Sequence, residues 1–240
     1  MINNRIKDQY ELQRKFYNST AHEYDQIHND QTDDEHAFAF AWMLGLIDMF
    51  EIKSILDIGC GTGKDIKKIM ELRPDIKIIG IEPSEKMREI GYQKKINRES
   101  LIDGDAMSLT FDDGQFDLVC VFGALHHIPS PRKAVSEMLR VSKKGIFISD
   151  CNNFGRGSFI SRSAKQIINK LGLWKIFFKL KNKGKRYATS LGNGPAYSYS
   201  VFNDYNFIKK ICKKVHLLNT QDSGHNLYKT ASHVALFGLK

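Results

Sequence analysis

Long apolar runs are absent from this sequence. None approaches the roughly 18 apolar residues that a membrane-spanning helix needs. Residues 1–10 are polar and charged, unlike the apolar centre of a secretory signal peptide. Hydrophobic residues still make up 42% of the 240 residues, enough for the core of one domain with an inserted subdomain. We therefore expect a soluble cytoplasmic protein without stable membrane association, and the oligomeric state stays open.

Cysteine is also scarce. The four cysteines are Cys60, Cys120, Cys151 and Cys212. They do not have the spacing of a zinc site, and a reducing cytoplasm disfavours disulfides. We therefore expect buried free thiols, and the sequence predicts no metal ligands.

Acidic residues are missing from one long segment. Residues 151–203 contain ten Lys and Arg but no Asp or Glu, whereas the rest of the chain has 26 basic and 27 acidic residues. The whole excess behind the net charge of +9 therefore belongs to this acid-free segment. A one-sided excess of this kind attracts anionic partners.

Strand-like and helix-like patterns alternate through most of the remaining sequence. Strands are predicted over residues 54–58, 76–81, 98–103, 116–122, 145–149, 215–220 and 232–238. Helices are predicted over residues 37–50, 64–72, 84–95, 131–141 and 204–213. This alternation is typical of a parallel α/β sheet with right-handed crossovers. The last two strands have only a loop between them, so they can pair as an antiparallel hairpin.

A glycine-rich turn follows the first predicted strand. Residues 55–63 read ILDIGCGTG, with Gly59, Gly61 and Gly63 at alternate positions. Glycine lets the backbone turn sharply and approach a ligand. A strand, a glycine turn and a helix form the cradle in which Rossmann-like folds bind an adenosine-containing cofactor. Because G-x-G-x-G is tighter than the G-x-G-x-x-G of a dinucleotide fold, it favours a ligand without a phosphate.

Other distinctive segments follow later strands. Glu82 ends the second strand, where a carboxylate can accept both hydroxyls of a ribose. Residues 104–106 (GDA) follow the third strand, and residues 122–128 (FGALHHI) belong to the end of the fourth and its loop. Ligands of open α/β sheets bind beyond the carboxyl ends of the strands, so we expect these segments to meet. Near the N-terminus, residues 17–25 read YNSTAHEYD.

Together these segments resemble the class I S-adenosylmethionine-dependent methyltransferases of small-molecule type. Asp57 and the three glycines match the family's D-x-G-x-G-x-G, and its G-D-A, L-H-H-I and Y-x-x-x-A-x-x-Y-D patterns are also present. The resemblance implies a Rossmann-like sheet of seven strands, parallel except for one antiparallel C-terminal strand, with a helical lid inserted after strand five. Residues 1–150 and 204–240 are then the core, and residues 151–203 are a basic, largely helical lid.

The resemblance also implies S-adenosylmethionine as cofactor, with S-adenosylhomocysteine as product. In the family, the acid after strand two binds the ribose, the Asp of G-D-A takes the adenine amino group, and the N-terminal segment closes the site. The expected cofactor-binding residues are Tyr17, Tyr24, Asp57, Gly59, Cys60, Gly61, Gly63, Glu82, Pro83, Met87, Asp105, Ala106, Phe122 and Gly123. A buried carboxylate at Asp57 needs donors, which we expect from the turn amides and the sulfonium.

Two adjacent histidines are the candidates for acid–base chemistry. Because imidazole titrates near neutral pH, His127, or otherwise His126, is the expected general base, while a purely structural role stays open. The chain lacks an Asn-Pro-Pro-Tyr-type tetrapeptide after strand four and a Pro-Cys nucleophile. In the family these mark nucleobase methylation, so we expect a hydroxyl or an aliphatic amine as acceptor.

The acid-free segment has several interpretations. Apolar positions between residues 160 and 178 recur at helical spacing, with Lys and Arg elsewhere. This pattern predicts a lid that attracts a phosphorylated, nucleotide-linked or carbohydrate-type metabolite, or a helix on anionic lipid that delivers a quinone or polyprenyl-linked sugar. An RNA-binding face, or charge that only keeps a lid soluble, are further alternatives. Because the segment follows strand five above the site, we favour an anionic small molecule and expect no nucleic acid.

The substrate contacts expected near this segment are Arg156, Tyr197, Tyr199 and His225. A weaker resemblance in the same segment is to methyltransferases that modify carbohydrates or secondary metabolites. Two other classes of function stay open. A nicotinamide oxidoreductase shares the strand, the glycine loop and Glu82, but it needs a glycine where Lys64 stands. A non-catalytic module would bind the cofactor without turnover.

Overall fold

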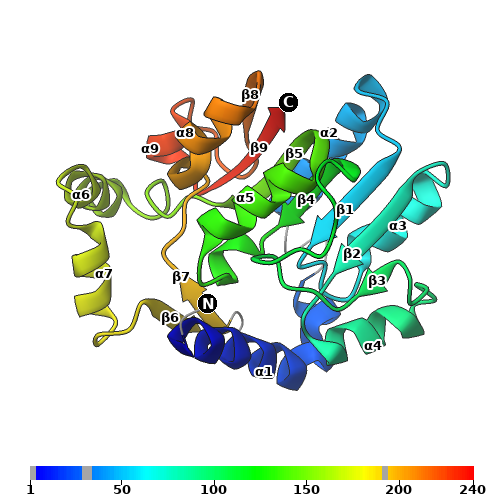
Figure 1. Cartoon of the computed structure of the whole chain (residues 1–240). Helices are drawn as coiled ribbons and strands as arrows, with labels where there is room; N and C mark the ends of the chain where they lie inside the picture. The colour runs from blue at the N-terminus through cyan, green and yellow to red at the C-terminus, as the bar shows by residue number, and fades with distance from the viewer. Residues whose placement is uncertain (1–3, 29–33, 191–193) are drawn as a thin grey trace.

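A seven-stranded sheet lies at the centre of the computed structural model, which describes residues 4–28, 34–190 and 194–240 (Figure 1). The strand order is β3-β2-β1-β4-β5-β9-β8. The strands are β1 (Ser54–Ile58), β2 (Lys77–Ile81), β3 (Leu101–Ile102), β4 (Phe116–Phe122), β5 (Ser142–Cys151), β8 (Lys214–Asn219) and β9 (His233–Leu239). Only β9 opposes its neighbours, running antiparallel to β5 and β8, while the other pairs of this sheet are parallel. The predicted Rossmann-like sheet with one antiparallel C-terminal strand is confirmed.

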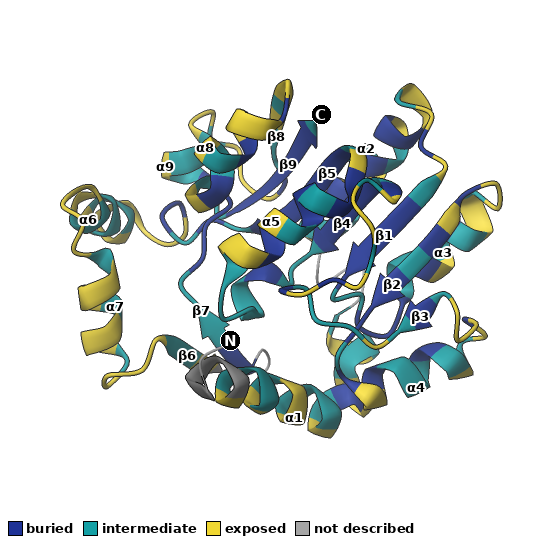
Figure 2. Cartoon of the chain, viewed as in Figure 1, coloured by how far each residue is buried: buried dark blue, intermediate teal, exposed yellow. Residues whose placement is uncertain are grey.

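Helices cover both faces of this sheet. They are α2 (Asp34–Met49) and α3 (Lys64–Leu72) on one face, and α5 (Pro131–Val141) and α8 (Phe202–Ile211) on the other. Strand side chains alternate between faces, so Ile55 of β1 packs on the α2 side and Leu56 packs on the α5 side. Figure 2 shows the buried residues concentrated in the central strands, as expected of parallel strands covered on both faces.

The third strand is shorter than predicted. The prediction covered residues 98–103, but only Leu101 and Ile102 pair with β2. The backbone amide of Ser100 donates to the Asn97 carbonyl and side-chain oxygens at 3.2 and 2.6 Å. This turn satisfies the Ser100 amide locally, so Ser100 contributes to β2 through its carbonyl, which accepts from the Gly80 amide at 2.8 Å.

The acid-free segment forms two helices and a hairpin. They are α6 (Phe159–Lys170), α7 (Trp174–Lys181), and the antiparallel pair β6 (Tyr187–Ser190) and β7 (Gly194–Tyr197). The helical face expected between residues 160 and 178 is split at Gly172, whose φ of 74° is left-handed, a conformation that favours glycine at a helix end. No residue of α6 or α7 is buried, and both helices lie at one side of the molecule, away from the sheet (Figures 1 and 2).

The N-terminal helix α1 (Asn4–Ile27) lies across the carboxyl ends of the strands, beside α4 (Glu85–Gln93) and β7 (Figure 1). Asn18 Oδ1 accepts a hydrogen bond from Ser84 Oγ at 2.7 Å. Asp25 pairs with Lys94 Nζ at 2.5 Å. These contacts hold α1 against the two ends of α4 through polar groups.

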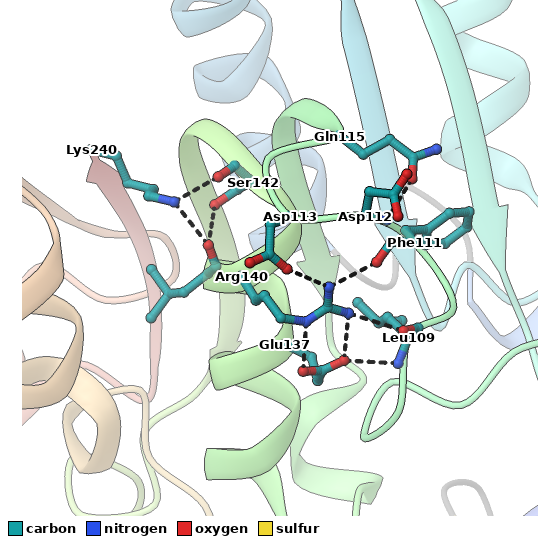
Figure 3. Close-up of polar contacts among 10 residues, drawn as sticks. Leu109, Phe111, Asp112, Asp113, Gln115, Glu137, Arg140, Ser142 and Lys240 are labelled. Carbon is teal, nitrogen blue, oxygen red and sulfur yellow. Dashed lines mark hydrogen bonds and ion pairs between the residues drawn. The ribbon is translucent and has the colours of Figure 1, made fainter.

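Arg140 joins α5 to the loop that precedes β4 (Figure 3). Its guanidinium donates to the carbonyl oxygens of Leu109 and Phe111 at 3.0 and 2.8 Å. It also pairs with Glu137 at 2.9 Å and with Asp113 at 2.8 Å. One side chain thus satisfies backbone carbonyls of a loop that has no ladder of its own.

The four cysteines are free thiols, as predicted. Cys120 and Cys212 are buried, and Cys60 and Cys151 are partly buried. Within the described part of the chain, no helix combines the length and the hydropathy that crossing a bilayer requires.

The packing of the core predicts that the stability of the protein depends strongly on Phe147. This side chain is fully buried in β5 beside Trp42 and Phe122. Phe147→Ala should lower the free energy of unfolding by about 3–5 kcal/mol, because it leaves a cavity among rigid neighbours. Phe159→Ala is the matched control, since Phe159 is 75% exposed, and it should change stability by less than ~0.5 kcal/mol. Urea denaturation measures both, and equal losses would contradict this account of the core.

Candidate active site

The glycine turn after β1 is built by close packing. Gly59, Gly61 and Gly63 have φ values of 66°, 57° and 74°, the left-handed region that favours glycine. A Cβ at Gly59 would lie 2.7 Å from Ala124 Cβ, and one at Gly61 would lie 3.3 Å from the Tyr24 ring. The turn therefore touches the loop after β4 and helix α1 at once.

The amides of this turn have partners within the protein. Those of Gly59 and Cys60 donate to the last carbonyl of β2 at 2.8 and 3.2 Å. The amide of Gly61 donates to Glu82 Oε2 at 3.1 Å, and that of Gly63 donates to the Cys60 carbonyl at 2.9 Å. A phosphate cradle needs several amides aimed at the anion, and these four are already used.

Glu82 is the central acceptor of the site. It is 6% exposed and accepts from Ser84 N at 2.8 Å and from Gly61 N at 3.1 Å, one bond on each oxygen. Each carboxylate oxygen keeps a further lone pair for a ligand hydroxyl. Burial, only partly opposed by these two hydrogen bonds, raises the pKa of Glu82 to about 7.

Asp57 is buried one residue before the end of β1. Its carboxylate accepts a long hydrogen bond from Cys120 Sγ at 3.7 Å. We expected the turn amides to donate to Asp57. Four of them instead donate to the acceptors given above, so the expectation is wrong for these four amides. Burial raises the pKa of Asp57 well above its ordinary value.

Helix α1 provides the roof of the site. Tyr17 lies edge-on to Tyr24 and His127, with ring centroids 6.0 and 5.8 Å apart. Tyr10 Oη donates to the Gly104 carbonyl at 3.5 Å, and Thr62 Oγ1 donates to Asp25 at 2.6 Å. The predicted entry segment, residues 17–25, is therefore in contact with the glycine turn and with the loop after β4, while Tyr10, which precedes it, contacts the loop after β3.

Two adjoining cavities open beneath this roof, with volumes of about 100 and 1000 Å³. Of the predicted residues, both are lined by Tyr17, Tyr24, Gly59, Phe122, Gly123 and His127. The smaller is also lined by Gly61, Glu82, Pro83, Met87, Asp105 and Ala106. The larger is also lined by Asp57, Cys60, His126, Arg156, Tyr197 and Tyr199. Segments predicted to meet at the carboxyl edge of the sheet do so.

Two of the predicted residues lie outside both cavities, and hydrogen bonds within the protein occupy polar groups of others. Gly63 lines neither cavity, and His225 lies on an exposed stretch outside both. The Tyr199 hydroxyl is buried and donates to Asp204 at 3.1 Å. Asp105 Oδ1 accepts from the Met107 amide at 2.8 Å, which leaves its other oxygen for a ligand.

The two histidines occupy η1 (Leu125–His127) and differ in their surroundings. His127 Nδ1 donates to the Pro195 carbonyl at 2.9 Å, so Nε2 carries the lone pair. Burial first, and then the neighbouring His126, lower the pKa of His127 to about 3. A base with this pKa binds a proton too weakly to take one efficiently from a hydroxyl or ammonium at neutral pH, which disfavours the expectation of His127 as general base.

His126 instead faces a carboxylate. Its Nδ1 lies 2.7 Å from Asp150 Oδ1. Asp150 is fully buried and also accepts from the amides of Leu125 and Cys151 at 2.9 and 2.7 Å. Burial acts to raise the pKa of Asp150, but His126 and these hydrogen bonds outweigh it and hold that pKa well below its ordinary value. This arrangement fixes the orientation of the His126 imidazole.

The sequence interpretation missed Asp150, which contacts His126 but lines neither cavity, and also Glu35, His36 and His233 of the larger cavity. Asp150 near the end of β5 had a usable signal, since ligands bind beside the carboxyl ends of parallel strands. The other three belong to no motif. They come from the start of α2 and the start of β9 and meet only in the folded chain.

The chain is similar to methyltransferases in sequence. Residues 56–149 match the family model described as methyltransferase domain. The demethylmenaquinone methyltransferase of Staphylococcus carnosus is 32% identical over 145 residues, which is 58% of this chain and 59% of that protein. That of Staphylococcus epidermidis is 30% identical over 132 residues, 54% and 55% of the two chains. The match thus spans less than three fifths of each of these relatives.

Solved structures extend the likeness over nearly the whole chain. A possible histamine N-methyltransferase of Thermotoga maritima aligns with a TM-score of 0.55 and 22% identity, over 94% of this chain and 99% of that one. Magnesium protoporphyrin IX methyltransferase of Synechocystis, with S-adenosylmethionine bound, aligns with a TM-score of 0.61 and 14% identity, over 97% of both. At these identities the likeness concerns the fold.

The His126–Asp150 pair generates a stability prediction. Because the pKa of Asp150 is lowered in the fold, its contribution is present above the ordinary Asp pKa of about 3.9 and is lost as pH falls below it. At pH 7, Asp150→Asn should lower the free energy of unfolding by about 3 kcal/mol, since it removes a fully buried carboxylate that accepts three hydrogen bonds. Asp113→Asn, at an 81% exposed side chain, is the control and should change little. Chemical denaturation at pH 7 measures both, and an unaltered Asp150→Asn would refute the pairing.

Proposed function

Because residues 56–149 belong to the methyltransferase domain family within a class I methyltransferase fold, we propose that the protein transfers a methyl group from S-adenosylmethionine to a small-molecule acceptor. The observation that supports this proposal is the arrangement of Glu82 and the glycine turn. Glu82 accepts the amide of Gly61, and four amides of the turn already donate to acceptors within the protein. A nicotinamide dinucleotide needs a diphosphate cradle that these amides do not supply. The antiparallel β9 between β5 and β8 also departs from the parallel dinucleotide-binding sheet.

The residues present fit this cofactor. Glu82 would hold the ribose hydroxyls, and the free oxygen of Asp105 would hold the adenine amino group in the smaller cavity. Met87 and Ala106 provide apolar walls there. Asp57 lines the larger cavity, where its carboxylate would face the charged part of the ligand. The tyrosines of α1 would cover the cofactor and exclude water.

When bound, S-adenosylmethionine supplies a methyl group already activated on a sulfonium. The residues of the chain then orient the acceptor, exclude water and remove a proton. The His126–Asp150 pair is suited to remove the proton of the acceptor. The carboxylate fixes Nδ1 of His126, which leaves Nε2 to accept that proton. His127 remains a neutral hydrogen-bond acceptor that shares a wall of both cavities.

The acceptor we propose is a hydroxyl or aliphatic amine of an anionic metabolite. Arg156 and Arg162, both from the acid-free segment, line the larger cavity. Lys165 is committed elsewhere, donating to the carbonyls of Asn153 and Arg156. Acidic residues such as Asp57 and Asp222 also line this cavity, so the two guanidiniums mark the part of its wall that suits a phosphate or carboxylate on the acceptor.

Binding of S-adenosylhomocysteine tests the cofactor assignment. The ligand hydroxyls donate to ionised Glu82, whose pKa is raised to about 7, so affinity should rise with pH through that value, by up to ~tenfold per unit below it. Glu82→Gln should weaken binding by ~10–100-fold and flatten the profile. Glu89→Gln, at an exposed position of α4, is the control.

Isothermal titration calorimetry gives both affinity and pH profile. If a nicotinamide dinucleotide bound in place of S-adenosylhomocysteine, or Glu82→Gln bound it as the wild type does, the proposed function would be wrong. If the cofactor bound tightly but transfer to every acceptor failed, the non-catalytic module would be the better account.

A second candidate takes its acceptor from a membrane. The faces of α6 and α7 expose large apolar side chains, including Ile160, Leu171 and Leu180 at 79%, 65% and 74%. Ten basic and no acidic residues share this segment. An exposed apolar face surrounded by cations is typical of a helix that rests on anionic lipid. Relatives named for demethylmenaquinone fit a lipid-borne acceptor, and a polyprenyl phosphate would satisfy the arginines as well.

Vesicle flotation distinguishes the two candidates. If the acceptor is lipid-borne, the protein should float with phosphatidylglycerol vesicles and less so at high salt, because each cation near the surface contributes about 1 kcal/mol. Ile160→Glu with Leu180→Glu should weaken flotation at least ~tenfold. Met49→Glu, at a 74% exposed residue of α2, is the control. No flotation at physiological salt would favour a water-soluble anionic acceptor, and dimerisation lost in the double variant would assign the face to a second copy.

A further inference from the structure

A group of metal-ligating side chains lies in the wall of the larger cavity. Glu35 and His36 come from the first turn of α2, and His233 begins β9. Their ligating atoms all lie within 4.8 Å of one another. Three groups from two distant elements therefore converge closely enough for small side-chain movements to place them around one cation.

Both imidazoles are oriented by hydroxyl groups. His36 Nδ1 lies 3.0 Å from Ser149 Oγ, and His233 Nδ1 lies 2.6 Å from Thr220 Oγ1. A hydroxyl oxygen can accept the Nδ1 proton, which leaves the lone pair on Nε2 of each ring. Metal-binding histidines characteristically have their second nitrogen fixed in this way.

The Nε2 atom of His233 lacks a partner. It is buried, and among the described residues it makes no hydrogen bond. His233 as a whole is only 5% exposed. A buried polar atom without a partner costs about 1–3 kcal/mol, so such atoms in native proteins call for a ligand or another physical reason. This orphaned nitrogen is independent of the clustering and points to the same site.

The loop after β4 leaves room beside the second ring. A Cβ at Gly123 would lie 2.8 Å from His36 Nε2, so this nitrogen faces a position where only glycine fits. Gly123 has a left-handed φ of 64°. The ring thus reaches the shared wall of the two cavities without a side chain in between.

We propose that Glu35, His36 and His233 bind one divalent first-row transition cation of the zinc or cobalt type. Two imidazoles and one carboxylate suit such ions, and three protein ligands leave a coordination position open toward the larger cavity. The carboxylate offsets part of the charge of the cation. If the proposed function is right, on which this step rests, the open position takes the acceptor oxygen and favours its deprotonated form.

A neighbouring cluster is a poorer metal site. His126, Asp150 and Cys151 also have ligating atoms within 4.8 Å of one another. Both oxygens of Asp150, however, already accept protein hydrogen bonds. The Cys151 thiol donates to the Tyr199 carbonyl, and burial raises its pKa well above the ordinary value. A thiolate ligand is therefore disfavoured there.

Titration of the chelator-treated full chain, without a histidine tag, with Co²⁺ tests the proposal. Visible absorption should show one equivalent bound with d–d bands and no thiolate charge-transfer band. Glu35→Gln and His36→Gln should each weaken Co²⁺ binding tenfold or more, and Ser149→Ala by about tenfold through the lost support of His36. His216→Gln is the matched control, since His216 is an exposed histidine on β8.

The outcomes are separable from those of the cofactor assignment. Glu35→Gln is isosteric at a partly exposed position, so circular dichroism and S-adenosylhomocysteine affinity should stay unchanged while Co²⁺ binding falls. Unchanged Co²⁺ affinity in both ligand variants, a thiolate band, or equal loss in His216→Gln would overturn the metal site. Loss of S-adenosylhomocysteine binding in the wild type would instead overturn the proposed function and leave the metal site standing.

Discussion

The two hydrogen bonds that Glu82 accepts organise this end of the molecule. They join the glycine turn after β1 to the start of α4, because one oxygen takes the amide of Gly61 and the other that of Ser84. The same carboxylate is buried, so it is both a structural tie and an acceptor with spare lone pairs. Moving it would disturb the turn, the neighbouring helix and the ligand site together.

The rest of the site is assembled against that tie. Tyr24 rests on Gly61, and Asp25 reaches Thr62 and Lys94, so α1 lies on the turn itself. The loop after β4 approaches from the other side, where Ala124 meets Gly59. Left-handed glycines make these approaches possible, because a Cβ at either position would meet a neighbour.

The larger cavity is lined by parts of the chain that differ in how well they are packed. Its floor comes from the core strands, whereas part of its wall comes from the acid-free segment, whose helices α6 and α7 bury no residue. A well-packed core can position the cofactor side precisely. In the function that we propose, the acceptor would instead contact the exposed, basic segment.

Several elements of the fold and of the site could be predicted from short stretches of sequence. The bounds of β1, α3, β4 and α5 follow from apolar periodicity, glycine and proline, because those signals act over a few residues. Glu82 and Asp105 were predictable for a related reason, since carboxyl ends of parallel strands share one edge. By contrast, the turn at Asn97 and the break at Gly172 depend on side-chain and backbone choices that periodicity does not report.

The sequence alone determined the sheet, the glycine turn and the likeness of the cofactor-binding motifs to those of methyltransferases, because each is specified by residues close together in the chain. Tertiary structure decided which histidine meets a carboxylate, and it alone brought Glu35 and His36 to His233. It also decided that the apolar positions of α6 and α7 face outward rather than into a core. These outcomes depend on which distant elements pack together, and no local pattern carries that information.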